Sequence, residues 1–283
     1  MLCTSLIWLL ISTLFARYNR LFAADYLPFD RVFIIVFENI DYEDALAQPY
    51  FNRLTKQGKL LTNYHALTHP SQPNYVAMIS GSTKGVRLDY DSDIDRLNLV
   101  DRFEAIGKSW ITYQEDYPIS RGCFTGSERP YVRKHNPFVS FVNIQNNSER
   151  CTHIVNANIL QEDIKNTNLA DFIFYTPNLN NDGHDTGIDY AGEWFESFFE
   201  PLLANAIFKE TLFIITFDEN KPFGLIDFKK NHIYTLLIGP GLSPGSADSS
   251  WYDHYSIIAT LVDIWKIEGF GLDDANAKPF KLD

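Results

Sequence analysis

The run VFIIVFEN at residues 32–39 decides the fold. Its first six residues are all β-branched or aromatic, which is typical of a strand buried on both faces of a parallel sheet. The runs FIFY at 172–175 and LFIITF at 212–217 repeat this pattern. Two further strands are expected at 110–113 and 233–238. The chain therefore contains at least three strands that belong in the interior of one sheet.

Amphipathic segments alternate with these strands and are expected to be helices. They cover about residues 49–57, 72–79, 97–106, 154–165, 190–206 and 255–265. Alternating strands and helices predict an α/β fold with a mostly parallel central sheet and helices on both faces. With 283 residues, 45% of them hydrophobic, the chain has ample material for a large core. A disordered protein is excluded.

Polar residues follow the three buried strands. Glu38-Asn39 comes after the first, the segment 180–185 after the second and Asp218-Glu219 after the third. Ligands bind beyond the carboxyl ends of strands in such sheets. Carboxylates brought together there would repel one another, and a hard divalent cation held by their oxygens would offset this. Each segment alone could equally consist of turn or cap residues, but together they favour a metal site.

A candidate nucleophile lies in THPSQPNY at residues 68–75. Ser71 is expected at or just before the start of a helix, with Pro73 tolerated in the first turn. Free backbone N–H groups at a helix start favour an anion, and a serine beside a metal ion can attack phosphorus. The alternative is an ordinary N-cap serine, which is the commoner role of serine in that position.

Three of the seven histidines fall near the predicted edge of the sheet: His69, His184 and His254. Imidazole can bind a metal, and imidazolium can bind phosphate or protonate a leaving group. Any one of them alone is more often a hydrogen-bonded structural residue. We assign His65 and His232 to that structural class. His135 and His153 lie in or next to an irregular segment and receive no role.

The first residues predict export. The apolar stretch Leu6–Ala16 has the length of a signal-peptide core and is short for a membrane span. We expect a signal peptide over residues 1–24, with an uncleaved signal anchor as the alternative. The mature protein would then be secreted, without stable membrane association. The net charge of −12 disfavours nucleic acid as a partner, although a metal ion can still make a cleft attractive to a small anion.

Export also bears on the cysteines. Cys3 would leave with the signal peptide, and an oxidising compartment then favours a disulfide between Cys123 and Cys151. Two buried free thiols are the alternative. Between them, Asn146-Asn147-Ser148 forms a glycosylation sequon, which predicts a glycan on Asn146.

Five segments resemble the motifs of the phosphoesterase family that contains acid phosphatases and bacterial-type phospholipases C. They are FENIDY (37–42), THPSQPNYVAMISGS (68–82), PNLNNDGHDTG (177–187), ITFDEN (215–220) and DHYSIIATLVDIW (253–265). Their order is the family's order, and the fungal acid phosphatase branch is the most similar. The family belongs to the alkaline phosphatase superfamily, so the resemblance implies a three-layer α/β/α sandwich. We expect a single catalytic domain over residues 25–283, with an insertion at about 118–151.

The resemblance also implies roles for individual residues. Glu38, Asn39, Asp218 and Glu219 match metal ligands, and Ser71 stands at the nucleophile position. His184 and His254 match positions that bind a second metal or the substrate phosphate, and His69, Asn74 and Asp182 match substrate-binding positions. Two-metal relatives supply more histidine ligands than this chain has. One divalent ion is therefore favoured, with His184 and His254 serving the phosphate and the leaving group.

The expected function is metal-dependent hydrolysis of small phosphate monoesters through a phosphoserine. A protonated His184 or His254 would assist departure of the alcohol, which predicts an acidic pH optimum. One alternative is a phosphodiesterase or phospholipase C, although phospholipases of the family tend to extend beyond the last motif. Another is an inactive secreted binding protein on the same fold. A sulfatase is disfavoured because position 71 carries no cysteine.

Overall fold

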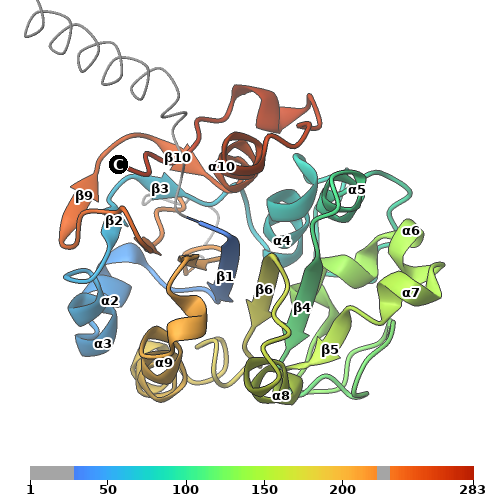
Figure 1. Cartoon of the computed structure of the whole chain (residues 1–283), viewed down its shortest axis with the longest axis horizontal. Coiled ribbons are helices and arrows are strands. Elements are labelled where there is room, and N and C mark those ends of the chain that lie inside the picture. Colours follow the sequence, from blue (N-terminus) through green and yellow to red (C-terminus); the bar gives the residue numbers. More distant parts are fainter. Residues whose placement is uncertain (1–28, 222–229) are drawn as a thin grey trace, which may run out of the picture.

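The computed structural model describes residues 29–221 and 230–283, and the predicted signal peptide lies outside them. Two sheets form the centre of the described chain (Figure 1). The strands are β1 (Arg31–Phe37), β2 (Lys59–Leu61), β3 (Tyr64–His65), β4 (Trp110–Gln114), β5 (Ile154–Asn156), β6 (Phe172–Thr176), β7 (Thr211–Phe217), β8 (Thr235–Ile238), β9 (Ser246–Asp248) and β10 (Tyr252–Asp253). The large sheet has the order β5-β4-β6-β1-β7-β8-β2-β9, and β10 pairs with β3 in the small one.

The predicted mostly parallel sheet is confirmed. β1 pairs in parallel with β6 on one side and β7 on the other, and β4 extends the parallel set next to β6. All seven residues of β7 are buried, as the continuous apolar run predicted. The antiparallel pairs lie toward one end, where β8 runs against β7 and β2 against β8. The carboxyl ends of β6, β1 and β7 therefore lie side by side.

Helices cover both faces of the large sheet (Figure 1). The α-helices are α2 (Tyr42–Ala47), α3 (Pro49–Leu54), α4 (Ser71–Ser80), α5 (Leu99–Ala105), α6 (Val142–Gln145), α7 (Ser148–Cys151), α8 (Leu160–Lys165), α9 (Ile188–Leu203) and α10 (Tyr255–Trp265). Figure 1 shows α4, α5 and α10 on one side of the sheet and α3, α8 and α9 on the other. This arrangement confirms the three-layer α/β/α sandwich.

Aromatic side chains alternate between the two faces along the strands. Phe37 packs against Phe51 of α3 and Phe195 of α9. On β6, Phe172 meets Phe103 of α5, and three residues later Tyr175 meets Phe198 of α9. Successive strand residues point to opposite faces, so the apolar runs fill both interfaces of the sandwich and fix the strand ends in place.

One expected helix is wrong in its first part. Residues 154–165 were predicted to be helical throughout, but residues 154–156 form β5, which pairs in parallel with β4. A 3₁₀ turn at Ala157–Ile159 then leads into α8. Ile154 and Val155 are β-branched and therefore suit a strand, and a run of three residues is too short for periodicity to show this.

The irregular stretch from 118 to 151 packs beside β4 and β5. It contains two 3₁₀ helices, η1 (Arg133–His135) and η2 (Pro137–Ser140), followed by α6 and α7. Cys123 and Cys151 form a disulfide, as predicted. Asn146 is exposed at the end of α6. Glycosylation itself stays a prediction.

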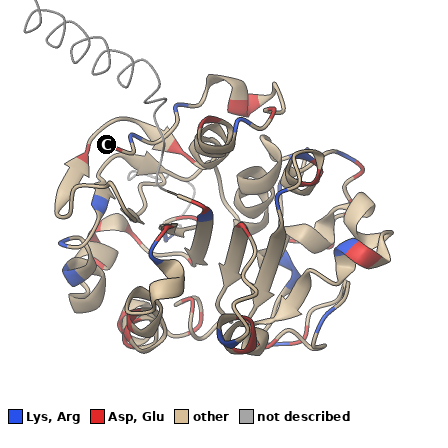
Figure 2. Ribbon diagram, viewed as in Figure 1, with Lys and Arg blue, Asp and Glu red and all other residues tan. Residues whose placement is uncertain are grey.

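Charged side chains are spread over the fold. Figure 2 shows Lys and Arg interspersed with Asp and Glu rather than gathered on one element. Within residues 29–221 and 230–283, no helix is long and apolar enough to cross a membrane.

The disulfide should contribute to stability. It closes a loop between residues 28 positions apart, so the double substitution Cys123→Ser, Cys151→Ser should lower the free energy of unfolding by about 3 kcal/mol. Urea unfolding of both proteins measures this difference. A reductant should destabilise the native protein and leave the double variant unchanged; equal stability of the two oxidised proteins would contradict the prediction.

Candidate active site

Acidic residues from three adjacent strands meet at one edge of the sheet. Glu38 follows β1, Asp182 lies in the loop after β6, and Asp218-Glu219 follows β7. Backbone hydrogen bonds join these segments, because Glu38 N–H donates to the Asp182 carbonyl at 3.1 Å and Asp218 N–H donates to the Phe37 carbonyl at 2.9 Å. All four carboxylates are buried, with exposed fractions of 0–2%. The sheet topology thus concentrates negative charge where solvent does not reach.

Ser71 faces this acidic cluster. It is the first residue of α4, and its Oγ donates a hydrogen bond to Glu38 Oε2 at 3.0 Å. The same oxygen lies 3.4 Å from Glu219 Oε1. Residues 33 and 148 positions apart in sequence are therefore brought together around one hydroxyl.

Asn39 and Asp218 complete the group. With its amide nitrogen turned inward, Asn39 donates to Glu219 Oε1 and Glu38 Oε2, both at 3.2 Å. Its backbone N–H donates to Asp218 Oδ1 at 3.1 Å, and φ of Asn39 is 42°, a left-handed conformation that asparagine tolerates. The other oxygen, Asp218 Oδ2, is buried and makes no hydrogen bond within the described residues.

This donor set fits a hard divalent cation. Burial, followed by the charges of Glu38 and Glu219, raises the pKa of Asp218 well above its ordinary value. Burial likewise raises the pKa of Glu219. Carboxylates in this situation must either bind protons or share a cation. Carboxylate, amide and hydroxyl oxygens are the ligands that hard cations prefer, and the unsatisfied Asp218 oxygen is available to one.

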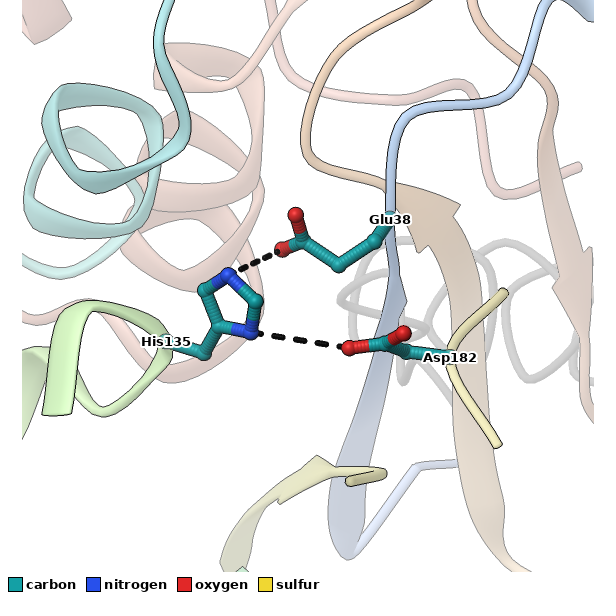
Figure 3. Close-up of side chains that lie close together, drawn as sticks. All are labelled: Glu38, His135 and Asp182. Atoms are coloured by element: carbon teal, nitrogen blue, oxygen red, sulfur yellow. Dashed lines mark ion pairs between the residues drawn. The ribbon is translucent and has the colours of Figure 1, made fainter. Parts of the chain in front are cut away.

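His135 also belongs to the site, although we predicted no role for it. Its ring lies between Glu38 and Asp182 (Figure 3), with Nε2 3.2 Å from Glu38 Oε1 and Nδ1 3.5 Å from Asp182 Oδ2. The ring stacks on Tyr75, whose hydroxyl donates to Glu38 Oε1 at 2.6 Å. Nothing in the sequence pointed to His135, because η1 belongs to the irregular segment and has no strand or helix period.

Charges around His135 are tightly linked. Burial opposes its protonation, but the carboxylates of Glu38 and Asp182 raise its pKa to about 9. Burial also opposes ionisation of Glu38, yet His135 holds the pKa of Glu38 at about 2. Burial raises the pKa of Asp182 to about 6. Ligand atoms of Glu38, His135 and Asp182 lie within 4.8 Å of one another, so this trio is a second place that could hold a metal ion.

Two of the predicted histidines lie at the opening of the site. His69 Nδ1 is 2.5 Å from Glu219 Oε2. His184 Nδ1 is hydrogen-bonded to Asp185 at 2.7 Å, and its ring centre is 6.1 Å from that of His135. Asp182 supports this turn, because its Oδ1 accepts the His184 backbone N–H at 2.7 Å. Both imidazoles are partly exposed, as a residue that contacts substrate must be.

The third histidine does not fit its expected role as a proton donor. His254 is completely buried, and both ring nitrogens are engaged: Nδ1 with the Tyr64 hydroxyl at 3.1 Å and Nε2 with the Asp218 carbonyl at 2.7 Å. Burial lowers its pKa to about 4. A neutral His254 therefore holds the backbone of Asp218 in position.

Asn74, which was predicted to bind substrate, makes hydrogen bonds within the loop that precedes α4. Its Oδ1 accepts the backbone N–H groups of Leu67 and Thr68, and its Nδ2 donates to the Thr68 carbonyl. The buried amide thus braces the loop before Ser71. Its polar atoms are used within the protein rather than offered to a substrate.

Comparison with known proteins identifies the family of this chain. Residues 38–268 match the model of the phosphoesterase family. The chain belongs to this family. It is 40% identical to a probable acid phosphatase of Kluyveromyces lactis and 37% identical to a phosphate-repressible acid phosphatase of Penicillium chrysogenum, covering 90% of this chain in both cases. It spans 62% and 64% of those relatives' own lengths.

More distant relatives are also phosphatases or share the same fold. A phosphatidylinositol-3-phosphatase of Mycobacterium tuberculosis is 28% identical over 91% of this chain and 84% of its own length. Among solved structures, a member of the alkaline phosphatase superfamily from Vibrio parahaemolyticus superposes with a TM-score of 0.61. That match has 14% identity and covers 89% of this chain and 70% of the other. The predicted family and the superfamily fold are both confirmed.

A cation held by these carboxylates should bind in a pH-dependent manner. Burial raises the pKa values of Asp182, Asp218 and Glu219 in the folded state, so the unfolded chain releases those protons first. The cation-free protein must then lose stability as pH rises from the ordinary carboxyl values near 4 toward the raised folded-state values, of which that of Asp182 is about 6. Glu38, whose pKa is lowered from 4.5 to about 2, contributes stability that is lost only as pH falls below about 4.5. His135, whose pKa is raised from 6.5 to about 9, adds a further loss of stability as pH rises above about 6.5.

We expect a divalent cation to raise the midpoint of thermal unfolding more at about pH 7 than at about pH 5, because it replaces the missing protons. Calorimetry with and without chelator, testing Mg²⁺, Mn²⁺, Ca²⁺ and Zn²⁺ in turn, measures the increase. An equal increase at both pH values, or none with any of these ions, would show that the carboxylates are not compensated by a cation.

Proposed function

We propose that this protein hydrolyses phosphate monoesters, with Ser71 as nucleophile and one divalent cation held by Glu38, Asn39, Asp218 and Glu219. The observation that carries the proposal is the Ser71 hydroxyl, hydrogen-bonded to Glu38 and 3.4 Å from Glu219 at the start of α4. The acid phosphatase activity named for the fungal relatives supports it. When bound, the cation would lower the pKa of the serine hydroxyl and neutralise charge on the phosphoryl group.

The first half-reaction follows from the position of Ser71. Glu38 Oε2 accepts the hydrogen of Oγ and so fixes the nucleophile. Attack of Oγ on phosphorus passes the Ser71 hydrogen to Glu38, forms an Oγ–phosphorus bond and breaks the bond to the ester oxygen, which takes up a proton and leaves as the alcohol. In the second half-reaction, water attacks the phosphoserine and gives one hydrogen to the group that protonated the alcohol, while Glu38 returns its proton to Ser71 Oγ as inorganic phosphate leaves.

We assign the proton donor to His184 rather than His254. Asp185 holds Nδ1 of His184, which leaves Nε2 for a substrate oxygen, and the ring is reachable from solvent. His254 meets neither condition, because both of its nitrogens are engaged in the interior. The sequence motifs offered both histidines equally, and the difference in their burial and hydrogen bonds supports the choice of His184.

We further propose that the catalytic unit covers residues 25–283 and acts outside the cell. The disulfide and the exposed sequon at Asn146 support export. The first 24 residues, on which a signal peptide depends, lie outside the described residues.

Replacing the nucleophile tests the central claim. Ser71→Ala should lower turnover of an aryl phosphate by roughly 10³-fold or more, while cation stabilisation persists because the carboxylates remain. The matched control is Ser80→Ala at the other end of α4, where Oγ donates to the Val76 carbonyl. A Ser71→Ala protein with near-normal turnover would exclude this serine as the nucleophile.

The proton donor can be identified from leaving groups. His184→Ala should reduce hydrolysis of an alkyl phosphate far more than that of 4-nitrophenyl phosphate, since a good leaving group needs no proton. The ratio of the two kcat values, native against variant, measures this, with His153→Ala as a control on a histidine that stacks on Trp110 away from the site. If His184→Ala slows both substrates equally, the histidine does not donate the proton.

A further inference from the structure

Asp89 engages two donors beside the nucleophile. It lies in the loop between α4 and α5, and its Oδ1 accepts the backbone N–H of Gln72 at 2.9 Å. Its Oδ2 accepts from Lys134 Nζ, also at 2.9 Å. Gln72 directly follows Ser71, and its N–H is one of the donors that the first turn of a helix leaves unsatisfied. A carboxylate therefore occupies an N–H of the residue that directly follows the proposed nucleophile.

Lys134 and Asp89 both act on the acidic cluster. After burial and His135, the charge of Lys134 contributes to holding down the pKa of Glu38. After burial and the opposing effect of His69, the charge of Asp89 is among those that raise the pKa of Glu219. Their side chains are only 22% and 25% exposed. The ion pair thus lies at the site and not on the remote surface.

The Gln72 side chain adds an unused donor. Its Oε1 accepts the backbone N–H of Tyr90, next to Asp89, at 3.1 Å. Its Nε2 is buried and has no partner among the residues that the structure describes. The contact between the start of α4 and the loop therefore leaves one buried donor unsatisfied, which is uncommon in native proteins and marks this place as a candidate for a bound ligand.

A phosphoryl group would need the same donors. Attack by Ser71 Oγ brings phosphorus to within bonding distance of residue 71, and its other oxygens then lie beside the next N–H of the helix. Backbone N–H groups at a helix start and a lysine ammonium are typical phosphate partners. The single Gln72 N–H cannot donate fully to a carboxylate and a phosphate at once, and repulsion between the two anions disfavours their sharing Lys134.

We propose that Lys134 and the Gln72 N–H bind the phosphoryl group of the substrate, and that Asp89 is a resident carboxylate which this group displaces. The inference rests on the proposed function. Lys134 is then a substrate-binding residue that favours dianionic monoesters over monoanionic diesters, and Asp89 weakens binding of every phosphate ligand.

The loop that carries Asp89 has a second attachment, which would hold it in place if Asp89 moved away. Buried Arg133, next to Lys134, pairs with Asp93 at 2.7 Å and donates to the Ser92 carbonyl at 2.8 Å. This second attachment joins the same loop to η1. Substitutions at Asp89 or Lys134 should accordingly leave the fold and cation binding intact, which thermal unfolding with added cation verifies.

Inorganic phosphate is the probe for the subsite. Calorimetric titration of cation-loaded protein should show roughly 10-fold weaker phosphate binding for Lys134→Met, because a charge-assisted hydrogen bond is lost. Asp89→Asn should bind phosphate about threefold or more tightly, since a neutral amide competes less for Lys134. A merely structural Asp89 would give the opposite sign.

A matched ion pair serves as control. Lys108 and Asp171 are 2.9 Å apart with 27% and 30% exposure, and they precede β4 and β6 at the opposite edge of the sheet. Lys108→Met should leave phosphate affinity unchanged. Unchanged affinity in Lys134→Met, or weaker binding in Asp89→Asn, would overturn the inference.

Kinetics separate this inference from the proposed function. For Lys134→Met, kcat/KM on an aryl phosphate monoester should fall roughly 10-fold more than on the matching diester. Equal losses would overturn the assignment of Lys134. If the native protein hydrolyses neither ester, the proposed function fails. The phosphate titrations would still show whether Asp89 is a carboxylate that phosphate displaces or a merely structural residue.

Discussion

Repulsion between buried carboxylates is the constraint on which the rest of this structure depends. β6, β1 and β7 each end beside an acidic segment, and parallel pairing places these ends next to one another. The resulting carboxylates have almost no contact with solvent. Such a group is tolerated only when protons, hydrogen bonds or cations offset its charge. The surrounding residues are the ones that supply this compensation.

The two carboxylate oxygens of Glu38 have different partners. Oε1 receives the Tyr75 hydroxyl and lies against His135, whereas Oε2 receives the Ser71 hydroxyl. One side therefore has an imidazole where a cation could also bind, and the other has the nucleophile. Because His135 already lies between Glu38 and Asp182, the single ion proposed on the Ser71 side would have only the remaining carboxylates to offset. This division supports one cation over two.

The sequence alone was sufficient to predict the acidic residues that directly follow buried strands. Apolar runs located β1, β6 and β7, and the motifs after them supplied the acidic residues. His135 could not be found this way, because η1 is too short to show a hydrophobic period in the sequence. Only the folded chain places its ring against Tyr75 and beside Glu38. The internal hydrogen bonds of His254 and Asn74 could not be predicted for a different reason: their partners are neighbours that only the folded chain brings near.

An acidic site that must bind an anion needs its charge to change when the ligand enters. A divalent cation and a protonated His135 would leave the four buried carboxylates close to neutrality, and Lys134 adds a further positive charge at the opening. In the ligand-free protein Asp89 cancels that charge. If a phosphate dianion takes over Lys134, the Asp89 carboxylate moves toward water, so the local charge changes by one unit instead of two. Exchange of one anion for another thus reduces the electrostatic cost of admitting a doubly charged substrate to an acidic protein.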